Sequence, residues 1–409
     1  MTSTAPQLLD VTKLPPEAAM ARRVDHAASI GASDLFLVTN EQHVAALVRH
    51  LGIVRTISIL GSEQGKRCIA HLRYVAGMDV AEKRRCADGR WIFQAESLDE
   101  QIDLRINSIP TLHGEDLAIR LLSRRSSIFT LENLGMTAEQ LSAYQAMLST
   151  PSGLILITGP TGSGKTATLY SSLLTLNNGR RKINTIEDPV EYAIDGLRQS
   201  QVNPAINLTF SDLLRSILRQ GPDVIMIGEI RDEETAQTAV RAANSGIVVF
   251  ATLHAASALG AIQSMRGLGI NPRFLSTALR GVVAQRLVRT LCLKCRTSFD
   301  LSDAPHTFDD LRRYLKPGEG NILYAARGCD ACGQSGYAGR TGIFEVLPVD
   351  RDIRHLIGEN VVARKIRDKA IGQSMLEFRQ SAMLKVARGE TSTEEVFRVI
   401  PGEDILAED

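Results

Sequence analysis

The alternation of apolar and polar positions is short-ranged in the first part of the chain. Between residues 34 and about 120, period-two stretches such as Trp91–Gln94 and Ile102–Ile106 are typical of half-buried strands. The tetrapeptide Ala87–Arg90 contains Asp-Gly and predicts a turn between two of them. An alanine-rich segment, Pro16–Ser29, precedes the strands and predicts a helix, because proline suits a first helical position. This part of the chain therefore predicts a small α+β domain.

The section from about residue 150 to 281 has a different pattern. Strand-length apolar runs alternate with helix-length segments such as Thr166–Leu176 and Glu233–Asn244. The runs are Leu154–Thr158, Ile183–Ile186, Val224–Ile227 and Val248–Thr252. Mostly apolar strands that alternate with helices are typical of a parallel sheet covered by helices on both faces. We therefore expect an α/β domain here.

These patterns divide the chain into consecutive parts. They are a lead-in at residues 1–24, a small α+β domain at 25–125, a linker at 126–140, an α/β domain at 141–290, a four-cysteine element at 291–345 and a helical region at 346–409. The linker prediction rests on the polar stretch Ser123–Thr137. In the last part, Thr391 and Ser392 predict an N-cap ahead of Glu394 and Glu395. A length of 409 residues agrees with two or three domains.

Composition narrows the class of partner and the compartment. Apolar residues make up 44% of the chain and charged residues 23%, which argues against wholesale disorder. The 47 Lys and Arg are balanced by 46 Asp and Glu, so we expect no nucleic-acid partner. The longest apolar runs are far shorter than the roughly 18 residues of a spanning helix, and the N-terminus lacks a signal-peptide pattern. We therefore expect a cytoplasmic protein.

A glycine-rich loop between the first strand and the first helix of the α/β section carries the clearest chemistry. It matches the pattern G-x-x-x-x-G-K-[ST] and consists of Gly159, Pro160, Thr161, Gly162, Ser163, Gly164, Lys165 and Thr166. Glycines at these positions let backbone N–H groups turn toward phosphate oxygens at a helix N-terminus. Lys165 would supply positive charge to the β- and γ-phosphates, and the Thr166 hydroxyl would bind Mg²⁺. The loop therefore predicts a nucleoside triphosphate site.

Further polar groups follow the next strands of the same section. Glu187 follows the second apolar run, Glu229 the third and His254 the fourth. A carboxylate beside the γ-phosphate can deprotonate water, which makes Glu187 the candidate general base, while Glu229 is the candidate acid on the Mg²⁺ side. Each residue by itself is as readily interpreted as a surface acid or a structural histidine. Because ligands bind at the carboxyl ends of strands in open α/β sheets, we expect them to converge on one nucleotide.

The cysteines suggest a metal site. Cys292 and Cys295 form one C-x-x-C pair, and Cys329 and Cys332 form a second. In a chain without an export signal such pairs favour a metal over disulfides, and four thiolates suit a tetrahedral structural Zn²⁺ site. The 33 residues between the pairs exceed the commonest zinc-ribbon spacing, so redox chemistry is the alternative.

Taken together, these segments resemble the secretion ATPases, the hexameric motors of type II secretion and type IV pilus assembly. The segments GPTGSGKTATLY, TIEDPVEY, RSILRQGPDVIMIGEIRD and ATLH look like the Walker A, Asp-box, Walker B and His-box motifs of that family. The resemblance continues through AQRLVRTLC, the cysteine pairs, GYAGRTGIFEVL and GETSTEEVFRV, and covers roughly residues 75–399. It implies an α/β, RecA-like P-loop domain with a parallel sheet, preceded by a small PAS-like α+β domain and followed by a zinc-bearing insertion and a helical tail.

The resemblance also implies roles for individual residues. Glu187 matches the glutamate that activates water, Glu229 the Walker B glutamate at Mg²⁺, and His254 the histidine near the γ-phosphate. Arginines that act in hydrolysis, in subunit contact or in closure of the N-terminal domain onto the phosphates are matched by Arg215, Arg219, Arg105 and Arg120. The implied cofactors are ATP, Mg²⁺ and structural Zn²⁺. The implied assembly is a homo-hexamer, peripheral to the inner membrane, that acts on a membrane platform protein.

Departures from the family pattern keep other interpretations open. Gly221 replaces an aspartate expected near the metal, Ile247 replaces the first histidine of the His box, and Ala255-Ala256 replaces Thr-Asn. A nucleotide-binding scaffold with little or no turnover is therefore an alternative. A DNA-uptake or conjugative pilus motor is another, which the sequence does not separate. The cysteine element favours the assembly branch over retraction motors, which generally lack it.

Overall fold

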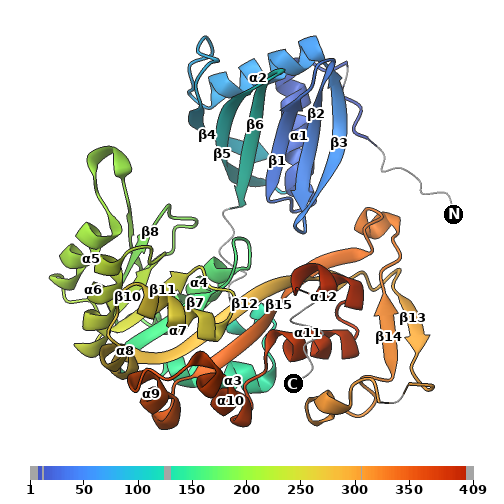
Figure 1. The fold of residues 1–409 in the computed structure, drawn as a ribbon. Coiled ribbons are helices and arrows are strands. Elements are labelled where there is room, and N and C mark those ends of the chain that lie inside the picture. Colours follow the sequence, from blue (N-terminus) through green and yellow to red (C-terminus); the bar gives the residue numbers. More distant parts are fainter. Residues whose placement is uncertain (1–7, 12, 124–129, 305, 402–409) are drawn as a thin grey trace. The chain divides into compact units, whose positions relative to one another are not determined.

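The computed structural model describes residues 8–11, 13–123, 130–304 and 306–401 (Figure 1). The chain divides into two compact units, Met1–Arg125 and Ser126–Asp409. Each unit has hydrophobic core clusters of its own. Within the described residues, no helix is both long enough and apolar enough to cross a membrane.

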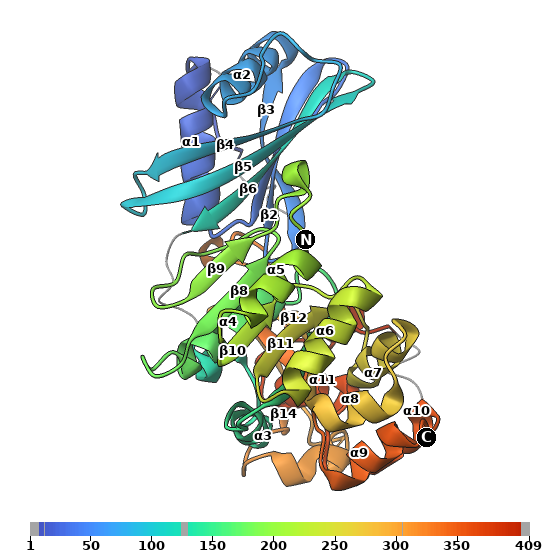
Figure 2. The same ribbon diagram turned by 90° about the vertical axis from the view of Figure 1, so that its left-hand side faces the viewer.

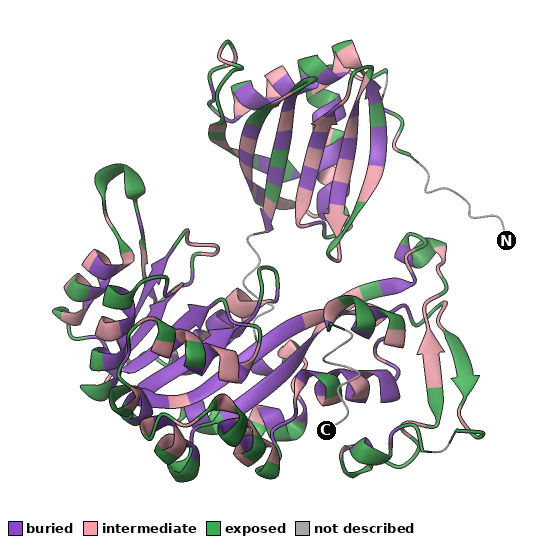
Figure 3. Cartoon of the chain, viewed as in Figure 1, coloured by how far each residue is buried: buried purple, intermediate pink, exposed green. Residues whose placement is uncertain are grey.

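The first unit is an antiparallel sheet with helices on one face (Figures 1 and 2). The strand order is β3-β2-β1-β6-β5-β4. The elements are α1 (Pro16–Ser29), β1 (Asp34–Thr39), β2 (His43–His50), β3 (Ile53–Gly61), α2 (Ser62–Val75), β4 (Ala87–Ala95), β5 (Glu100–Thr111) and β6 (Gly114–Ser123). Buried and more accessible residues alternate along these strands; in β1, Leu35 and Leu37 are buried, while Phe36 between them is more accessible (Figure 3). The predicted period-two pattern and the α+β class are confirmed.

The turn predicted at Ala87–Arg90 is wrong, because these residues begin β4 and pair with β5. Gly89 is needed for a close approach rather than for a turn. A Cβ there would lie 2.5 Å from the backbone oxygen of Ala76, and Arg90 donates its N–H to the same oxygen at 3.2 Å. A glycine inside a strand often marks such an approach of another backbone segment.

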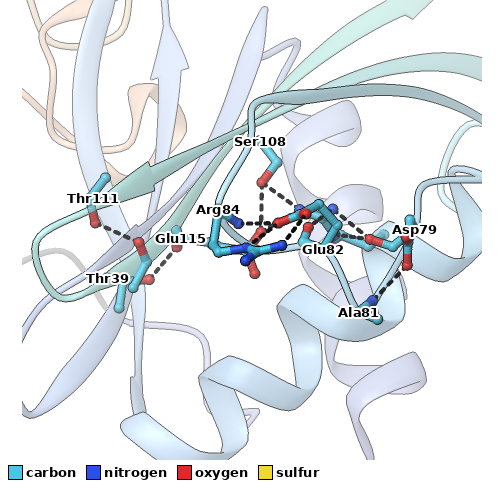
Figure 4. A network of polar contacts seen from close by, with 10 residues as sticks. Thr39, Asp79, Ala81, Glu82, Arg84, Ser108, Thr111 and Glu115 are labelled. Atoms are coloured by element: carbon cyan, nitrogen blue, oxygen red, sulfur yellow. Dashed lines mark hydrogen bonds and ion pairs between the residues drawn. The ribbon is translucent and has the colours of Figure 1, made fainter.

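A buried ion pair fixes the loop between α2 and β4 (Figure 4). The Arg73 guanidinium contacts the Glu115 carboxylate, and both side chains are almost fully buried. Ser108 Oγ donates to Glu115 Oε1 at 3.0 Å, and Arg73 donates through Nη2 to the backbone oxygens of Asp79 and Glu82, each at 2.6 Å. The loop backbone is therefore held by a charge inside the unit, in addition to its own side chains, since Asp79 accepts the N–H of Ala81 and Glu82 accepts the N–H of Arg84.

The second unit is built on a seven-stranded sheet in the order β15-β12-β7-β11-β10-β8-β9. Neighbouring strands are parallel except β15, which runs antiparallel to β12. The strands are β7 (Gly153–Thr158), β8 (Ile183–Glu187), β9 (Arg198–Gln201), β10 (Val224–Ile227), β11 (Val248–Leu253), β12 (Leu279–Leu291) and β15 (Tyr337–Pro348). The four predicted strands correspond to β7, β8, β10 and β11, each within one residue at either end.

Helices cover both faces of this sheet, and successive strand residues therefore enter different cores. In β7, Leu154 and Leu156 pack on one face, while Ile155 and Ile157 pack on the other. The helices are α3 (Ala138–Leu148), α4 (Lys165–Leu176), α5 (Phe210–Leu218), α6 (Glu233–Asn244), α7 (Ala258–Gly267), α8 (Pro272–Ala278), α9 (Arg351–Gly358), α10 (Ala363–Gly372), α11 (Phe378–Ala387) and α12 (Thr393–Val399). Burial on both faces explains why the strands are continuously apolar.

The segment between β12 and β15 carries the cysteine pairs and a small hairpin. The hairpin strands are β13 (Thr297–Asp300) and β14 (Ile322–Ala325), and β13 is exposed along its whole length (Figure 3). Near the C-terminus of the described chain, Ser392 caps α12 by accepting the N–H of Glu395. The predicted N-cap is thus confirmed at Ser392.

Candidate functional site

The carboxyl ends of β7, β8, β10 and β11 lie side by side at one edge of the sheet. Ile227 of β10 lies opposite Ile186 of β8 and Ala251 of β11. Leu253 of β11 lies opposite Thr158 of β7. The segments that follow these strands therefore leave the sheet at the same edge, where open α/β sheets bind their ligands.

The glycine-rich loop between β7 and α4 uses backbone conformations that favour glycine. Gly159, Gly162 and Gly164 have φ angles of 146°, 78° and 89°. The N–H groups of Gly162 and Gly164 have no hydrogen-bond partner among the described residues. Free N–H groups ahead of a helix are donors for phosphate oxygens, so the loop fits the phosphate chain of a nucleotide.

Gln285 of β12 braces this loop from the neighbouring strand. Its side chain is buried, Nε2 donates to the backbone oxygen of Ser163 at 2.7 Å, and Oε1 accepts from Thr168 Oγ1 at 2.6 Å. A Cβ at Gly159 would lie 2.3 Å from the backbone oxygen of Gln285. The Ser163 hydroxyl is buried and has no partner within the described part of the chain. The protein therefore fixes the loop's shape while leaving donors unused.

Glu229, two residues after β10, is surrounded by basic side chains. Its Oε1 lies 2.9 Å from His254 Nε2, and its Oε2 lies 2.6 Å from Arg231 Nη2. Burial lowers the pKa of Lys165, and the nearby Glu229 carboxylate partly opposes that shift. Lys165 Nζ donates to the backbone oxygen of Gly159 at 2.7 Å. The structure thus brings the loop lysine, Glu229 and His254 into one cluster.

Glu187 ends β8 beside this cluster and is 4% exposed. Its Oε2 accepts from the Tyr170 hydroxyl at 2.5 Å, and its Oε1 accepts from Thr185 Oγ1 at 2.5 Å and from Gln199 Nε2 at 3.1 Å. Burial raises the pKa of Tyr170, and the Glu187 carboxylate raises it further, so the phenol stays protonated and donates. The carboxylate is therefore held by three donors from three different elements.

The structure places Arg215 and Arg219 on and just after α5, outside this cluster. Arg215 Nη2 lies 3.1 Å from Asp212 Oδ1, and Arg215 also contacts Glu234 of α6. Arg219 donates through Nη2 to Ser216 Oγ at 3.4 Å. Both arginines are exposed, and none of these partners belongs to the cluster around Glu229.

Arg105 and Arg120 belong to the first unit, where they form part of a row across the sheet. Arg90 of β4, Arg105 of β5, Arg120 of β6 and Asp34 of β1 are successive cross-strand partners. Arg120 Nε lies 3.6 Å from Asp34 Oδ1, and Arg90 Nη2 lies 2.6 Å from Asp103 Oδ2. Three arginines therefore line one face of the sheet, and carboxylates of the same sheet pair with two of them.

The cysteines lie together at the far end of β12 and β15. All four sulfur atoms of Cys292, Cys295, Cys329 and Cys332 lie within 4.8 Å of one another. The Cys292–Cys329 and Cys295–Cys332 sulfur distances are 3.9 and 3.8 Å. Sulfur ligands of a tetrahedral Zn²⁺ with Zn–S bonds of about 2.3 Å are about 3.8 Å apart, so the arrangement fits this ion.

Backbone contacts explain how pairs so far apart in sequence meet. Cys292 donates its N–H to the backbone oxygen of Gly336 at 2.9 Å, which extends the β12–β15 ladder to both pairs. Burial would raise the pKa of the Cys332 thiol, but the N–H groups of Cys329 and Gly336, each 3.2 Å from Sγ, together with the side chains of Cys329 and Cys295 outweigh burial and lower the pKa to about 7. Such donors favour the thiolate that a metal needs.

Comparison with known proteins assigns the family. Residues 12–398 match the sequence profile described as Type II/IV secretion system protein. The chain belongs to this family. The type II secretion system ATPase E of Vibrio cholerae serotype O1 is 41% identical over 369 residues, which are 90% of this chain and 72% of that protein. The type II secretion system protein E of Dickeya dadantii is 42% identical over 372 residues, with the same coverage of 90% and 72%.

A solved structure supports the fold of this secretion-system protein. The ATPase DotB of Yersinia pseudotuberculosis superposes with a TM-score of 0.72 at 19% sequence identity, over 97% of this chain and 98% of that one. The family resemblance drawn from the motifs is confirmed, and so is the α/β fold with its parallel sheet. The four-cysteine cluster agrees with a zinc-bearing insertion.

Two of the departures from the secretion-system pattern lie away from the site. Ile247 precedes β11 and His254 follows it, so about 20 Å of strand separates them. Gly221 precedes β10, whereas Glu229 follows that strand. Gly221 and Glu229 of this chain are therefore at opposite ends of one strand. Only Ala255 is close, since its N–H donates to Thr158 Oγ1 at 2.8 Å.

Some residues of this site were missed by the sequence analysis. Arg231 binds Glu229, Gln285 braces the loop and Tyr170 holds Glu187. Gln285 and the adjacent Arg286 interrupt an apolar stretch, which was a usable signal of a buried polar role. Tyr170 gave no such signal, because its partner Glu187 comes from another element, and Arg231 is one of many charged residues in the loop after β10.

Proposed function

We propose that the chain is the ATP-hydrolysing motor of a type II secretion or pilus-assembly system. The observation that supports it most directly is the convergence of the glycine-rich loop, Glu229 and His254 at one sheet edge. A relative that is 41% identical over 90% of this chain carries the name ATPase, which gives the proposal its second support. The chemistry below concerns this chain's own residues.

Binding of the triphosphate is assigned to the loop between β7 and α4. The N–H groups of Gly162 and Gly164 would donate hydrogen bonds to phosphate oxygens. Lys165 would leave the backbone oxygen of Gly159 and bind the β- and γ-phosphates instead. Thr166 and Glu229 are the residues that would hold Mg²⁺, which neutralises charge that develops on the phosphates.

Activation of the attacking water is assigned to Glu187. Its oxygens already accept from Tyr170, Thr185 and Gln199, so acceptance of a proton requires one of these donors to yield. Tyr170 is on α4, the helix that begins at the phosphate loop, and nucleotide binding can therefore reach this contact through α4. His254 lies on the other side of Glu229 and is assigned to the γ-phosphate.

The arginines are proposed to complete the site when domains or subunits close. Arg215 and Arg219 are exposed and held by surface partners, which makes them available to a neighbouring subunit. Arg105 and Arg120 are cross-strand partners, and their guanidinium groups are assigned to the phosphates on closure, where Arg120 would leave Asp34. Charge-assisted contacts that form only on closure would couple hydrolysis to motion.

The assembly is proposed to be a homo-hexamer on the cytoplasmic side of the inner membrane. It would associate peripherally, through a platform protein, and without nucleic acid. A structural Zn²⁺ at Cys292, Cys295, Cys329 and Cys332 would fix the far ends of β12 and β15.

The test compares phosphate release by the wild type with release by Glu229→Gln under hexamer-forming conditions. Glu139→Gln, an exposed change in the first turn of α3, is the matched control. We expect turnover in the wild type and control, and at least a hundredfold loss in Glu229→Gln with nucleotide binding retained. Absence of wild-type turnover, with nucleotide bound and rings formed, would overturn the motor and favour the scaffold. Light scattering with a nonhydrolysable ATP analogue measures assembly.

A further inference from the structure

The loop that joins β11 to α7 carries His254 and is held from below at several points. Thr158 Oγ1 accepts the N–H of Ala255 at 2.8 Å and lies 2.9 Å from its backbone oxygen. Arg286 donates through Nη2 to the backbone oxygen of Ala256 at 3.4 Å. At the end of the loop, Ala258 donates its N–H to Glu345 Oε2 at 2.8 Å. The loop is thus fixed by β7, β12 and β15 together.

Glu345 is the least expected of these contacts, because its carboxylate is buried in the middle of the protein. The residue is 6% exposed, and no ion pair among the described residues includes it. Its second oxygen, Oε1, accepts the N–H of Phe378 at 3.3 Å. Ala258 and Phe378 are the first residues of α7 and α11, so one carboxylate receives the N-termini of two helices.

The charged groups that face Glu345 do not neutralise it by direct contact. Arg286 of β12 turns its Nη1 to the backbone oxygen of Val399 at 3.0 Å, and its guanidinium lies 4.7 Å from the ring centroid of Phe378. Glu377, the N-cap of α11, is a second acid nearby and repels the charge on Glu345. Helix N-termini favour an anion, which is the compensation the fold provides.

Burial of a carboxylate in this position costs free energy of folding, and a neutral residue would fill the same space at a lower cost. We propose that Glu345 is a positioning residue for ATP hydrolysis, which fixes the start of α7 and so holds His254 against Glu229. Through its second oxygen it ties the same loop to α11. This inference rests on the proposed ATPase function, and it adds a residue from β15, outside the motifs that mark the nucleotide site.

Protonation of Glu345 weakens its hydrogen bonds to the N–H groups of Ala258 and Phe378. Burial raises the pKa of Glu345 to about 7, since the N–H groups of Ala258 and Phe378 and the charge of Arg286 compensate only in part and Glu377 opposes them. The protonated carboxyl has one oxygen that carries hydrogen and accepts poorly, so one of the two helix N-termini loses its partner. The positioning therefore improves as the pH rises through about 7.

The first test is a pair of variants measured for kcat and KM at saturating and limiting ATP. Glu345→Gln removes one acceptor and turns an NH₂ group toward an N–H donor. Ser381→Ala is the control, because Ser381 Oγ accepts the N–H of Phe344 at 3.0 Å and joins α11 to β15 without contact to residues 254–258. We expect kcat to fall about tenfold in Glu345→Gln with KM for ATP within twofold, and both constants within twofold in Ser381→Ala.

The pH profile separates positioning from general damage. The ratio of wild-type to Glu345→Gln kcat is expected to grow from pH 6 to pH 8. A Gln variant with wild-type kcat, or a constant ratio across this range, would overturn the inference while wild-type turnover still supports the proposed function. Absence of wild-type turnover would instead count against the proposed function.

A measurement on the wild type covers the case in which Glu345→Gln does not fold. Hydrogen–deuterium exchange of a peptide that spans residues 255–260 is followed at pH 6 and pH 8 and corrected for the intrinsic exchange rate. The inference requires stronger protection at pH 8, because the ionised carboxylate then holds the N–H of Ala258. Equal protection at both values would contradict it, whatever the hydrolysis rate.

Discussion

Replacement of Gln285 by methionine tests whether the phosphate loop is held by β12. Methionine keeps the volume of the side chain but removes two buried hydrogen bonds, to the Ser163 oxygen at 2.7 Å and from the Thr168 hydroxyl at 2.6 Å. Each buried group left without a partner costs about 1–3 kcal/mol, so the variant should lose about 2–6 kcal/mol of stability. For a unit of this size, in which 1 kcal/mol shifts the Tm by a little under about 2 °C, that corresponds to a fall in Tm of roughly 3–10 °C.

A control variant, Gln140→Met, separates the effect of lost stability from the effect of altered loop geometry. Gln140 is also buried, donates through Nε2 to the Phe344 oxygen at 2.8 Å and accepts the Thr137 N–H at 3.1 Å. Gln140→Met therefore removes a similar pair of bonds from the same unit, one of them to Phe344, the cross-strand partner of Gln285, and neither of them to the loop. Both variants should melt earlier, but only Gln285→Met should raise the KM for ATP, by about tenfold. Equal KM values in the two variants would refute the bracing role of Gln285.

The remaining predictions concern the metal, the first unit and pH. Removal of metal by a chelator, or Cys329→Ser, should lower the zinc content to near zero and the Tm of the protein, as measured by atomic emission and calorimetry; unchanged melting without zinc would contradict a structural ion. Arg73→Met should destabilise the first unit by about 3–5 kcal/mol in urea, because it leaves the Glu115 carboxylate buried and unpaired, and Arg84→Met on the exposed loop is the control. The pKa of Glu345 is raised to about 7 from 4.5, so its contribution to stability is present below pH 4.5 and lost as the pH rises through 7. The stability advantage of the wild type over Glu345→Gln should therefore shrink by about 3 kcal/mol between pH 4.5 and pH 8, and a constant difference in urea titrations would disprove the assignment.

In the second unit, the strands that are buried on both faces could be predicted from the sequence. Strands such as Val224–Ile227 are apolar throughout because helices cover both faces, and this produces an unambiguous pattern. The turn at Ala87–Arg90 was predicted wrongly because Asp-Gly is usual in turns. Here Gly89 is needed because the backbone oxygen of Ala76 lies too close for a Cβ. This contact joins two segments of the folded unit, so the sequence around Gly89 does not predict it.

The site was predictable to the extent that its chemistry is local. The phosphate loop is a continuous motif, and Glu187, Glu229 and His254 each follow a strand. The contacts that hold them are not local: Gln285 is 122 residues from Ser163, and Glu345 is 87 residues from Ala258. The first contact arises because β12 lies parallel beside β7, and the second because β15 pairs with β12 across the whole cysteine segment.

The site divides into a fixed part and an exchangeable part, and burial decides which residue belongs to which. Arg231 and His254 are about half exposed, with 59% and 51% of their side chains accessible, and contacts of such groups with Glu229 are worth roughly 0–1 kcal/mol. A triphosphate can therefore displace them at small cost. Gln285 and Glu345 are buried, and loss of their hydrogen bonds costs about 1–3 kcal/mol for each group left unpaired. We therefore expect the buried residues to hold the loops in place while Arg231 and His254 exchange partners when a nucleotide binds.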